Sequence, residues 1–277
     1  MTFKADLPKI ARDIRVDIAK MFYIAGWGHF APALSCVDIL VALYWGGVIN
    51  THKLFEDDHD RVILSKGHGC AALYAVMSRW NYFPRNELSG FYQKGSPLIG
   101  LASSNVNGID IPTGSLGHGI CFATGTAISA KLSNADYYTY VILGDGESQE
   151  GSVWEAVQFA GAKHLDNMIV ILDYNKLQGS DWLESIIPIE PIADKWQSFG
   201  WTAHTVDGHD HNALVNVLNN VKKEKNKPHL IIANTVKGKG VSIAEADPSW
   251  HSRAPKGKEW EQVCIDLGIT MEELSKL

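Results

Sequence analysis

Short apolar runs alternate with helical stretches along most of this sequence. The runs predicted as strands are RVILS (61–65), YTYVIL (138–143), MIVIL (168–172), WTAHTV (201–206) and HLIIANT (229–235). Each run is short, rich in β-branched or aromatic residues, and separated from the next by a segment with helical periodicity. This alternation predicts an α/β fold with a doubly wound, mostly parallel sheet.

Two helices are predicted before the first strand. One begins near Asp6, has Pro8 in its first turn and ends at Gly26, and the other ends at Gly46. The segment 82–112 is rich in Gly, Pro, Ser and Asn and is predicted to be irregular. Later helices are predicted over about 69–80, 117–131, 150–162 and 210–224.

Composition restricts the class of protein. The chain has 277 residues, 45% of them hydrophobic, and a formal net charge of −6 without a long run of Lys or Arg. We expect a single domain (1–277) with an N-terminal helical segment, and no nucleic acid or anionic membrane as its main partner. No apolar run approaches the roughly 18 residues of a membrane span. The N-terminal MTFKADLPKIARD lacks the apolar core of a secretory signal.

The cysteines indicate a reducing compartment. Cys36, Cys70, Cys121 and Cys264 are far apart in the sequence and form no CxxC pair. Neither a disulfide framework nor a zinc-binding motif is therefore predicted. We expect four small buried side chains and a cytoplasmic location.

Polar segments follow three of the predicted strands, where ligands bind in doubly wound sheets. The segments are GDGES (144–148), DYN (173–175) and TVKGKG (235–240). In the first, Gly144 and Gly146 allow a sharp turn and a close backbone approach, and Asp145 adds a hard oxygen ligand. A free N–H at Gly146 or Glu147 near a helix N-terminus favours a phosphate. The segment thus indicates a phosphate held through a divalent cation, although a solvated acidic turn would have the same sequence.

Asn175 strengthens the metal hypothesis. It lies 30 residues after Asp145, beyond one predicted helix and one strand. In a parallel sheet this path returns the chain to the same edge, so the two side chains can face each other. A carboxylate, an amide oxygen and a backbone carbonyl form an oxygen set suited to Mg²⁺, with diphosphate oxygens and water as the remaining ligands.

The spacing GDG, about 30 residues, then N resembles the cofactor motif of thiamine-diphosphate enzymes. The surrounding GDGESQEGSVWEAVQFAGAKHLDNMIVILDYNKLQ resembles the transketolase family, and in particular the N-terminal subunit of split transketolases. TGSLGHG (113–119), VDGHD (206–210) and TVKGKGVS with a later WH at 250–251 also match, in the family's order. The resemblance covers nearly the whole chain and implies the family's diphosphate-binding (PP-domain) fold, with thiamine diphosphate as cofactor.

The resemblance also implies roles for individual residues. Asp145, Asn175 and the carbonyl of Leu177 would hold Mg²⁺ or Ca²⁺. The turn of Gly144, Gly146 and Glu147 would meet the diphosphate, chiefly through the Gly146 amide. The residues expected to contact the aminopyrimidine ring through their backbone are Gly114 and Leu116.

Four further residues are implied in catalysis. His29 and His68 would hydrogen-bond the ketol oxygens of the substrate, and His251 would lie near the diphosphate and the reacting carbon. Glu150 would contact a partner glutamate that activates the cofactor. A first-turn helix carboxylate favoured by the dipole is an equally natural interpretation of Glu150. For His118 we expect only a helix-packing role.

The chain departs from the family pattern at three places. Leu101 stands where the family has a histidine that binds the donor's terminal hydroxyl, Phe30 replaces a proline beside His29, and LQGSDW (177–182) replaces the usual sequence after Asn175. Leucine can neither donate nor accept a hydrogen bond. One hypothesis is a donor other than an ordinary ketose phosphate, with a modified or missing terminal hydroxyl. The alternative is drift, in which another residue supplies the contact.

The resemblance implies a partner as well. In the family, the activating glutamate belongs to a pyrimidine-binding domain, which we do not find in this sequence. We therefore expect a C-terminal transketolase subunit carrying that domain, an α₂β₂ assembly, and two-carbon ketol transfer between sugar-type substrates. The alternatives are a non-catalytic regulatory half, a 2-oxoacid dehydrogenase or deoxyxylulose-phosphate-synthase-like subunit, and a phosphatase of the haloacid-dehalogenase type, which the missing DxD pair disfavours.

Overall fold

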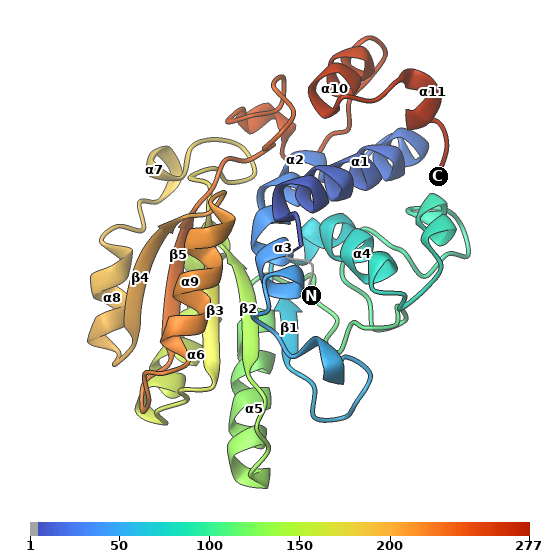
Figure 1. Ribbon diagram of the computed structural model, residues 1–277. Helices are drawn as coiled ribbons and strands as arrows, with labels where there is room; N and C mark the ends of the chain where they lie inside the picture. Colours follow the sequence, from blue (N-terminus) through green and yellow to red (C-terminus); the bar gives the residue numbers. More distant parts are fainter. Residues whose placement is uncertain (1–4) are drawn as a thin grey trace.

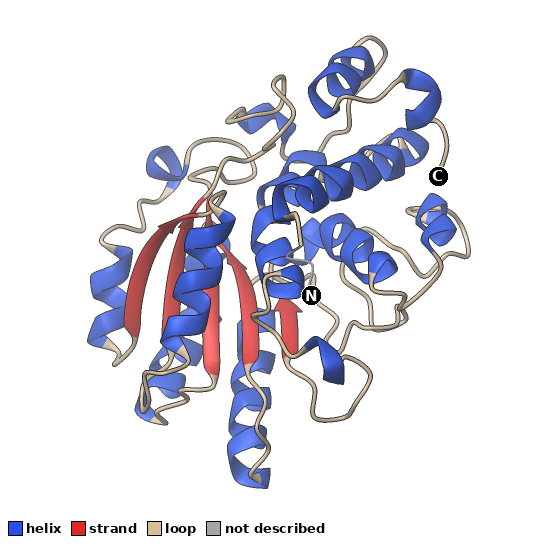
Figure 2. Cartoon of the chain, viewed as in Figure 1, coloured by secondary structure: helices blue, strands red, loops and turns tan. Residues whose placement is uncertain are grey.

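The computed structural model describes residues 5–277, and at its centre lies a parallel sheet of five strands within that range (Figures 1 and 2). The strands are β1 (Arg61–Leu64), β2 (Thr139–Gly144), β3 (Met168–Tyr174), β4 (Thr202–Asp207) and β5 (His229–Asn234). Their order in the sheet is β1-β2-β3-β5-β4, and every neighbouring pair is parallel. The predicted α/β fold with a parallel sheet is confirmed.

The helices that the sequence predicts are present with small shifts at their ends. The α-helices of the described residues are α1 (Leu7–Ala25), α2 (Phe30–Ser35), α3 (Val37–Trp45), α4 (Cys70–Arg79), α5 (His118–Ser133), α6 (Gly151–Ala162), α7 (Leu183–Ile186), α8 (Ile192–Ser198), α9 (His211–Val221), α10 (Glu259–Leu267) and α11 (Met271–Leu274). The short helices α2, α7 and α11, together with α8 and α10, were not predicted. Segment 82–112 is irregular as predicted, apart from a 3₁₀ helix over Arg85–Gly90.

Local sequence signals explain where α1 begins and ends. The Asp6 carboxylate accepts a hydrogen bond from the Lys9 N–H at 3.1 Å, so it caps one of the free amides of the first turn. Pro8 occupies the first turn, where its missing N–H removes no helical hydrogen bond. Gly26 ends the helix at φ +74°, a left-handed conformation that glycine adopts without strain.

Side-chain alternation along the strands divides the core into two layers. Tyr140 and Ile142 of β2 pack on one face with α1, α3, α4 and α9. Val141 and Leu143 pack on the other face with α5, α6 and α8. Residues of a strand point alternately to the two sides, so near-continuous apolar runs such as TYVILG fill both layers.

Two buried aspartates hold the helical layer together. Asp17 of α1 is 0% exposed and forms ion pairs with Arg79 and Arg85. The Asp38 carboxylate in α3 lies 2.6 Å from both the Arg15 guanidinium and His209 Nδ1. His209 belongs to the predicted VDGHD motif, so in the structure this motif anchors the loop after β4 to α3.

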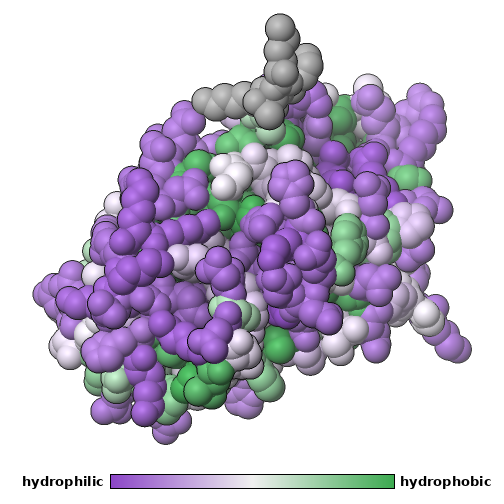
Figure 3. All heavy atoms as spheres, turned by 60° about the horizontal axis from the view of Figure 1, so that its bottom comes forward, coloured by the Kyte–Doolittle hydropathy of each residue, from purple (hydrophilic) through white to green (hydrophobic). Residues whose placement is uncertain are grey.

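One face of the molecule is mainly polar. Most of the face that Figure 3 brings forward is hydrophilic, with hydrophobic residues in separate groups. Cys36, Cys70 and Cys264 are buried and unbridged, but Cys121 on α5 is exposed, which corrects the prediction that all four cysteines are buried. Over residues 5–277, the helices are all too short or too polar to cross a bilayer.

Candidate functional site

A cavity of about 610 Å³ opens at the carboxyl ends of the strands. In Figures 1 and 2 this is the end of the sheet toward which the strand arrows point, near α2 and α7. Every site residue predicted from the sequence lines it, as does Leu101: His29, His68, Leu101, Gly114, Leu116, Gly144, Asp145, Gly146, Glu147, Glu150, Asn175, Leu177 and His251. Segments far apart in the sequence therefore meet at one place, whereas the chemical roles of these residues remain predictions.

Asp145 lies at the floor of the cavity without a cationic partner. Its side chain accepts hydrogen bonds from the Gly146 N–H at 2.8 Å and from the Lys176 N–H at 2.5 Å. The residue is only 3% exposed, and among residues 5–277 no Lys, Arg or His forms an ion pair with it. Burial, with the nearby charge of Asp173, raises the pKa of Asp145 to about 7. A bound cation would relieve this energetic cost.

The neighbouring oxygens suit a divalent metal ion. Asn175 is nearly buried, and its Oδ1 accepts the Leu177 N–H at 3.1 Å, which turns the amide oxygen into the loop after β3. Each oxygen of Asp145 and Asn175 uses one lone pair in these bonds and retains another. Carboxylate, amide and carbonyl oxygens are the hard ligands that Mg²⁺ and Ca²⁺ take. The residues present therefore fit the predicted metal.

The two glycines of the GDG turn were predicted to allow a sharp turn and a close backbone approach. Neither Gly144 nor Gly146 has a positive φ, so the backbone conformation of the turn does not itself require glycine. A Cβ at Gly146 would lie 2.9 Å from Cγ of Gln178, so this glycine permits a close approach of the loop after β3. A Cβ at Gly144 would make only ordinary contacts within the chain.

The buried Glu147 carboxylate stabilises the GDG turn through hydrogen bonds. Its Oε1 accepts hydrogen bonds from the Ser65 hydroxyl at 2.6 Å and the Gly117 N–H at 2.9 Å. Its Oε2 accepts the Gly144 N–H at 3.0 Å. The carboxylate thus joins β1, the start of α5 and the end of β2. It borders the cavity, but both of its oxygens are engaged within the protein.

A buried ion pair crosses the edge of the sheet beside this turn. Lys66 Nζ donates to Asp173 Oδ2 at 2.5 Å, and the two residues are 2% and 0% exposed. The Ser35 hydroxyl donates to the same oxygen at 2.6 Å, and the Thr235 hydroxyl donates to the other. Burial alone would raise the pKa of Asp173, but Lys66 and these hydrogen bonds hold it below its usual value.

Three histidines form one wall of the cavity. The ring centroids of His29 and His68 are 5.2 Å apart, and each lies 5.4 Å from that of His251. Burial, with the Lys237 ammonium second, lowers the pKa of His251 to about 3. Burial likewise lowers the pKa of His29 and of His68. All three rings are therefore neutral at pH 7, and each can both donate and accept a hydrogen bond.

Lys237 supports this wall from the TVKGKG segment. Its Nζ lies 2.8 Å from His251 Nδ1 and donates to the Gln178 carbonyl at 2.8 Å. Burial, followed by the charge of Lys66, lowers the pKa of Lys237 to about 8. Lys237 therefore adds positive charge to a cavity that the resemblance assigns to a diphosphate.

Leu101 gives the cavity an apolar side. A Cβ built on Gly114 would lie 2.7 Å from Leu101 Cδ1, so the leucine rests directly against this glycine. The Tyr74 hydroxyl donates to the Leu101 carbonyl at 2.6 Å and fixes its backbone. Leu116 and Ile187 also line the cavity. The position that the resemblance assigns to a histidine thus reaches the site but offers no polar group there.

Glu150 and His118 lie nearer the surface. Glu150 is the N-cap of α6, and its side chain is exposed and forms no capping hydrogen bond. His118 begins α5, is exposed, and is not among the residues that line the cavity. The packing role that we predicted for His118 is therefore not found within the described part of the chain.

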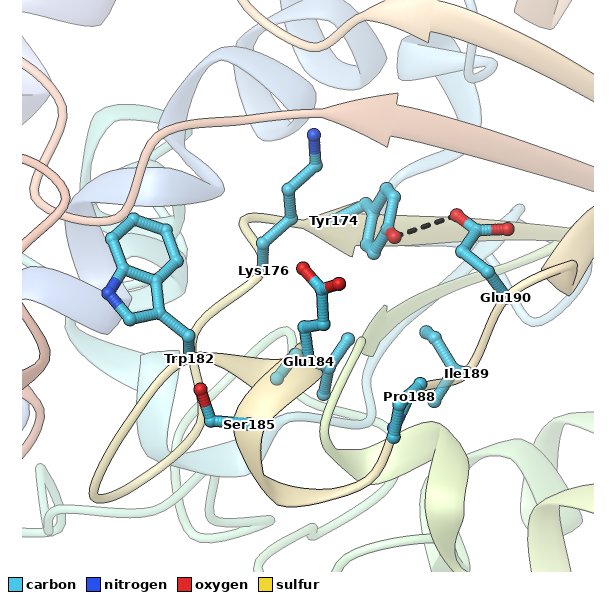
Figure 4. Close-up of a pocket in the computed structure, with 9 residues that line it drawn as sticks. Tyr174, Lys176, Trp182, Glu184, Ser185, Pro188, Ile189 and Glu190 are labelled. Atoms are coloured by element: carbon cyan, nitrogen blue, oxygen red, sulfur yellow. Dashed lines mark hydrogen bonds between the residues drawn. The ribbon is translucent and has the colours of Figure 1, made fainter.

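A second cavity of about 560 Å³ lies on the other side of the chain segment that follows β3 (Figure 4). Tyr174 and Lys176 line it, whereas Asn175 and Leu177 line the first cavity. The Tyr174 hydroxyl donates to the Glu190 carboxylate at 2.7 Å, as the dashed line in Figure 4 marks. Alternating residues of one segment therefore serve two different cavities.

Three polar residues of the site were not predicted from the sequence. Asp173 and Lys237 lie in the DYN and TVKGKG segments that were predicted to border a site but received no individual role, and Lys66, just after a predicted strand, was not named at all. The signal that identified Asp145, a polar side chain at the carboxyl edge of a parallel sheet, applies equally to them. Their mutual contacts could not be read from the sequence.

Comparison with known proteins agrees with this geometry. Residues 8–275 match the family model described as transketolase, thiamine diphosphate binding domain. The chain is 38% identical over 244 residues to a 6-deoxy-6-sulfo-D-fructose transketolase subunit, SqwG, of Clostridium sp., covering 87% of this chain and 89% of that protein. It is 35% identical over 263 residues to an apulose-4-phosphate transketolase subunit of Phocaeicola vulgatus, covering 95% and 94%.

Solved structures give the same result for the fold. The transketolase of Leishmania mexicana superposes with a TM-score of 0.88 at 28% identity, over 98% of this chain. The match covers 43% of the Leishmania chain, so this protein spans less than half the length of that transketolase.

Proposed function

The chain belongs to the transketolase family, and from that premise we propose that its cavity binds thiamine diphosphate through a divalent metal ion. It is similar to the N-terminal subunit of split transketolases and is a subunit of a transketolase-type transferase. The observation that carries the proposal is Asp145, a carboxylate buried at the cavity floor with no cation of the described chain paired with it.

We assign the metal to Asp145, Asn175 and the Leu177 carbonyl, with Mg²⁺ as the first candidate and Ca²⁺ as the second. The Gly146 N–H and the ammonium of Lys237 would bind diphosphate oxygens. Gly114 and Leu116 would border the aminopyrimidine ring. When bound, thiamine diphosphate supplies the nucleophilic carbon and the electron sink for ketol transfer.

The three neutral histidines would position the substrate. His29 and His68 would bind the oxygens of a two-carbon ketol unit, and His29 Nδ1 is a buried atom without a hydrogen-bond partner among the described residues. His251 would donate a hydrogen bond near the reacting carbon, because Lys237 donates to its Nδ1 and the ring proton is then carried by Nε2. Neutral rings suit this task because they exchange donor and acceptor roles.

A partner protein would complete the site. The names of the relatives call them subunits, and the exposed Glu150 at the cavity rim could contact a glutamate of a pyrimidine-binding domain. We propose that the partner is a C-terminal transketolase subunit, that the two form an α₂β₂ assembly, and that the location is cytoplasmic, which the four unbridged cysteines favour.

We further propose a sugar-type donor other than an ordinary ketose phosphate. Relatives act on apulose-4-phosphate and 6-deoxy-6-sulfo-D-fructose by their names, and Leu101 places an apolar group where a hydroxyl would need a partner. The modification in 6-deoxy-6-sulfo-D-fructose lies at C6, far from the C1 hydroxyl, so the two observations support the proposal separately. Kinetics with paired ketose and 1-deoxyketose donors test it, and a strong preference for the ordinary ketose phosphate would refute it.

Cofactor binding distinguishes the enzyme from a regulatory half. The chain would be purified with its native partner, and thiamine diphosphate and Mg²⁺ bound per chain would be quantified. Stoichiometric cofactor, lost in Asp145→Asn and retained in Glu190→Gln, supports the assignment, because Glu190 is a carboxylate of the neighbouring cavity. A complex that binds no cofactor would favour the non-catalytic alternative.

A further inference from the structure

Two histidines and a glutamate face one another at the end of the sheet opposite the cavity. His204 lies in β4, His229 is the first residue of β5, and Glu224 follows α9. One ligand atom from each of the three residues lies within 4.8 Å of the other two. In Figure 1 this region is at the outer edge of the sheet, where β4 runs beside β5. None of the three residues belongs to the cavity.

The strand register explains how the three side chains meet. Thr202 pairs with His229, and His204 pairs with Ile231. Residues two apart along a strand point to the same side, so all four side chains lie on one face. Ile231 packs in the core layer that contains Leu214 of α9. The two histidines therefore face α9, and the chain leaving α9 brings Glu224 to them.

In this group, within residues 5–277, the Nε2 atom of each histidine lacks a hydrogen-bond partner. His229 is 0% exposed, and neither its Nε2 nor that of His204 has a hydrogen-bond partner among residues 5–277. His204 Nε2 lies 3.8 Å from Glu224 Oε1, which is too far for a hydrogen bond. A buried nitrogen without a partner costs free energy, and such atoms are rare in folded proteins.

Thr202 orients the buried ring. Its hydroxyl lies 2.6 Å from His229 Nδ1, so Nδ1 can donate to the hydroxyl oxygen, which leaves the lone pair of Nε2 available to a ligand. Burial lowers the pKa of His229, although the negative charge of Glu224 opposes this change. Histidine metal ligands are neutral and usually donate their second ring N–H to an oxygen in this way.

We propose that His204, His229 and Glu224 bind a transition-metal dication of the Zn²⁺ type. Two imidazoles and one carboxylate form a ligand set that Zn²⁺ takes, with water in the fourth position. The side chains of His204 and Glu224 are 34% and 47% exposed, so both the ion and this water can enter from solvent. Mg²⁺ and Ca²⁺ prefer oxygen ligands, so this site and the Asp145 site select different metals. The bound ion would join the edge strand β4 to β5 and to the end of α9.

Calorimetric titration of the untagged full chain with Zn²⁺, in excess Mg²⁺, tests the site. We expect one Zn²⁺ per chain, and binding weakened at least tenfold in His204→Ala and in Glu224→Gln. Both changes are at partly exposed side chains, so the fold should tolerate them. His52→Ala removes an exposed histidine elsewhere and should bind like the wild type. At about a hundredfold excess over Kd, Zn²⁺ should raise the unfolding midpoint by about 5 °C.

Two results would overturn the proposal. One is a wild-type chain that binds no stoichiometric Zn²⁺ and shows no shift in its unfolding midpoint. The other is His204→Ala and Glu224→Gln variants with wild-type affinity, combined with loss of Zn²⁺ binding in His68→Ala, which would place the ion in the histidine cluster of the cavity. Neither result depends on whether the chain binds thiamine diphosphate.

Discussion

Two aspartates at the carboxyl edge of the sheet are both buried, yet their surroundings differ. Asp173 of β3 pairs in register with Gly144 of β2, and Asp145 is the next residue along the chain. Asp173 accepts hydrogen bonds from the Lys66 ammonium and from two hydroxyls. Asp145 accepts hydrogen bonds from two backbone N–H groups and, among residues 5–277, pairs with no cation.

The difference separates a structural carboxylate from one available to a ligand. The pKa of Asp173 is lowered because Lys66 supplies the countercharge, whereas burial and Asp173 itself raise the pKa of Asp145 to about 7. Residue type, burial and position in the sheet are nearly the same for the two. What differs is whether the chain itself provides the cation, and this decides where an external ion is stabilised.

Removing the cation of the Lys66–Asp173 ion pair should have the largest effect on stability. Lys66→Met leaves Asp173 buried without its countercharge, and we expect a loss of about 3–5 kcal/mol in the free energy of unfolding, measured by urea denaturation. Lys131→Met is the matched control. It breaks the 2.6 Å pair with Asp166 at the surface, where Lys131 is 39% exposed, and should cost less than about 1 kcal/mol. Equal stability of the two variants would contradict the structural role of Lys66.

Removing the charge of Asp145, which has no cationic partner in the described part of the chain, should weaken cofactor binding and leave the fold intact. In Asp145→Asn we expect thiamine diphosphate affinity in Mg²⁺ to fall at least hundredfold, about 2.7 kcal/mol. The free energy of unfolding of the cofactor-free chain should change by less than about 1 kcal/mol, because losing a buried charge offsets losing one acceptor. Calorimetry and urea denaturation measure the two quantities. A variant that binds cofactor normally would remove Asp145 from the metal site.

The same comparison applies to the apolar side of the cavity at Leu101. There the described chain provides no hydrogen-bonding partner for a ligand, just as it provides no cation at Asp145. Leu101→His would return a polar ring to a side chain that is 39% exposed and lines the cavity. If the site lacks a partner for a terminal hydroxyl, kcat/KM for a ketose phosphate donor should rise about tenfold, or about 1.4 kcal/mol. The value for the matching 1-deoxy donor should stay unchanged. Equal changes for both donors would mean that position 101 does not meet this hydroxyl.

Much of the fold could be predicted because single segments carry its signals. The five strands appear as apolar runs, and the caps of α1 appear as Asp6, Pro8 and Gly26. The short helices α7 and α11 were missed because four residues give no measurable periodicity. Helices α8 and α10 have seven and nine residues, about two turns each, and were also missed because they lie between long loop segments.

The candidate site divides in the same way. Asp145 and Asn175 were predicted because their position after strands and their spacing are visible in the sequence. The partners of Lys66 and the inward direction of the Glu147 carboxylate depend on contacts between segments far apart in the chain. Such contacts are set by packing, for which one sequence offers no periodic signal. The same holds for His204 and His229, which meet only through the register of β4 and β5.

The smallest expected effect concerns the ion pair of His59 and Asp110. In this pair the countercharge is present only when the histidine is protonated, so it is intermediate between Asp173, which has a permanent countercharge, and Asp145, which has none among residues 5–277. His59 Nε2 lies 3.1 Å from Asp110, and both side chains are partly exposed. The hydrogen bond to Asp110 raises the pKa of His59 above 6.5, although burial and Arg61 oppose it. The pair therefore stabilises the fold at low pH, and this contribution is lost as the pH rises through the raised pKa. From about pH 6 to about pH 8, the wild type should lose up to about 1 kcal/mol more than His59→Gln in thermal unfolding. Identical pH profiles would show that this partly exposed pair contributes nothing to stability, and that a countercharge matters only for a fully buried carboxylate.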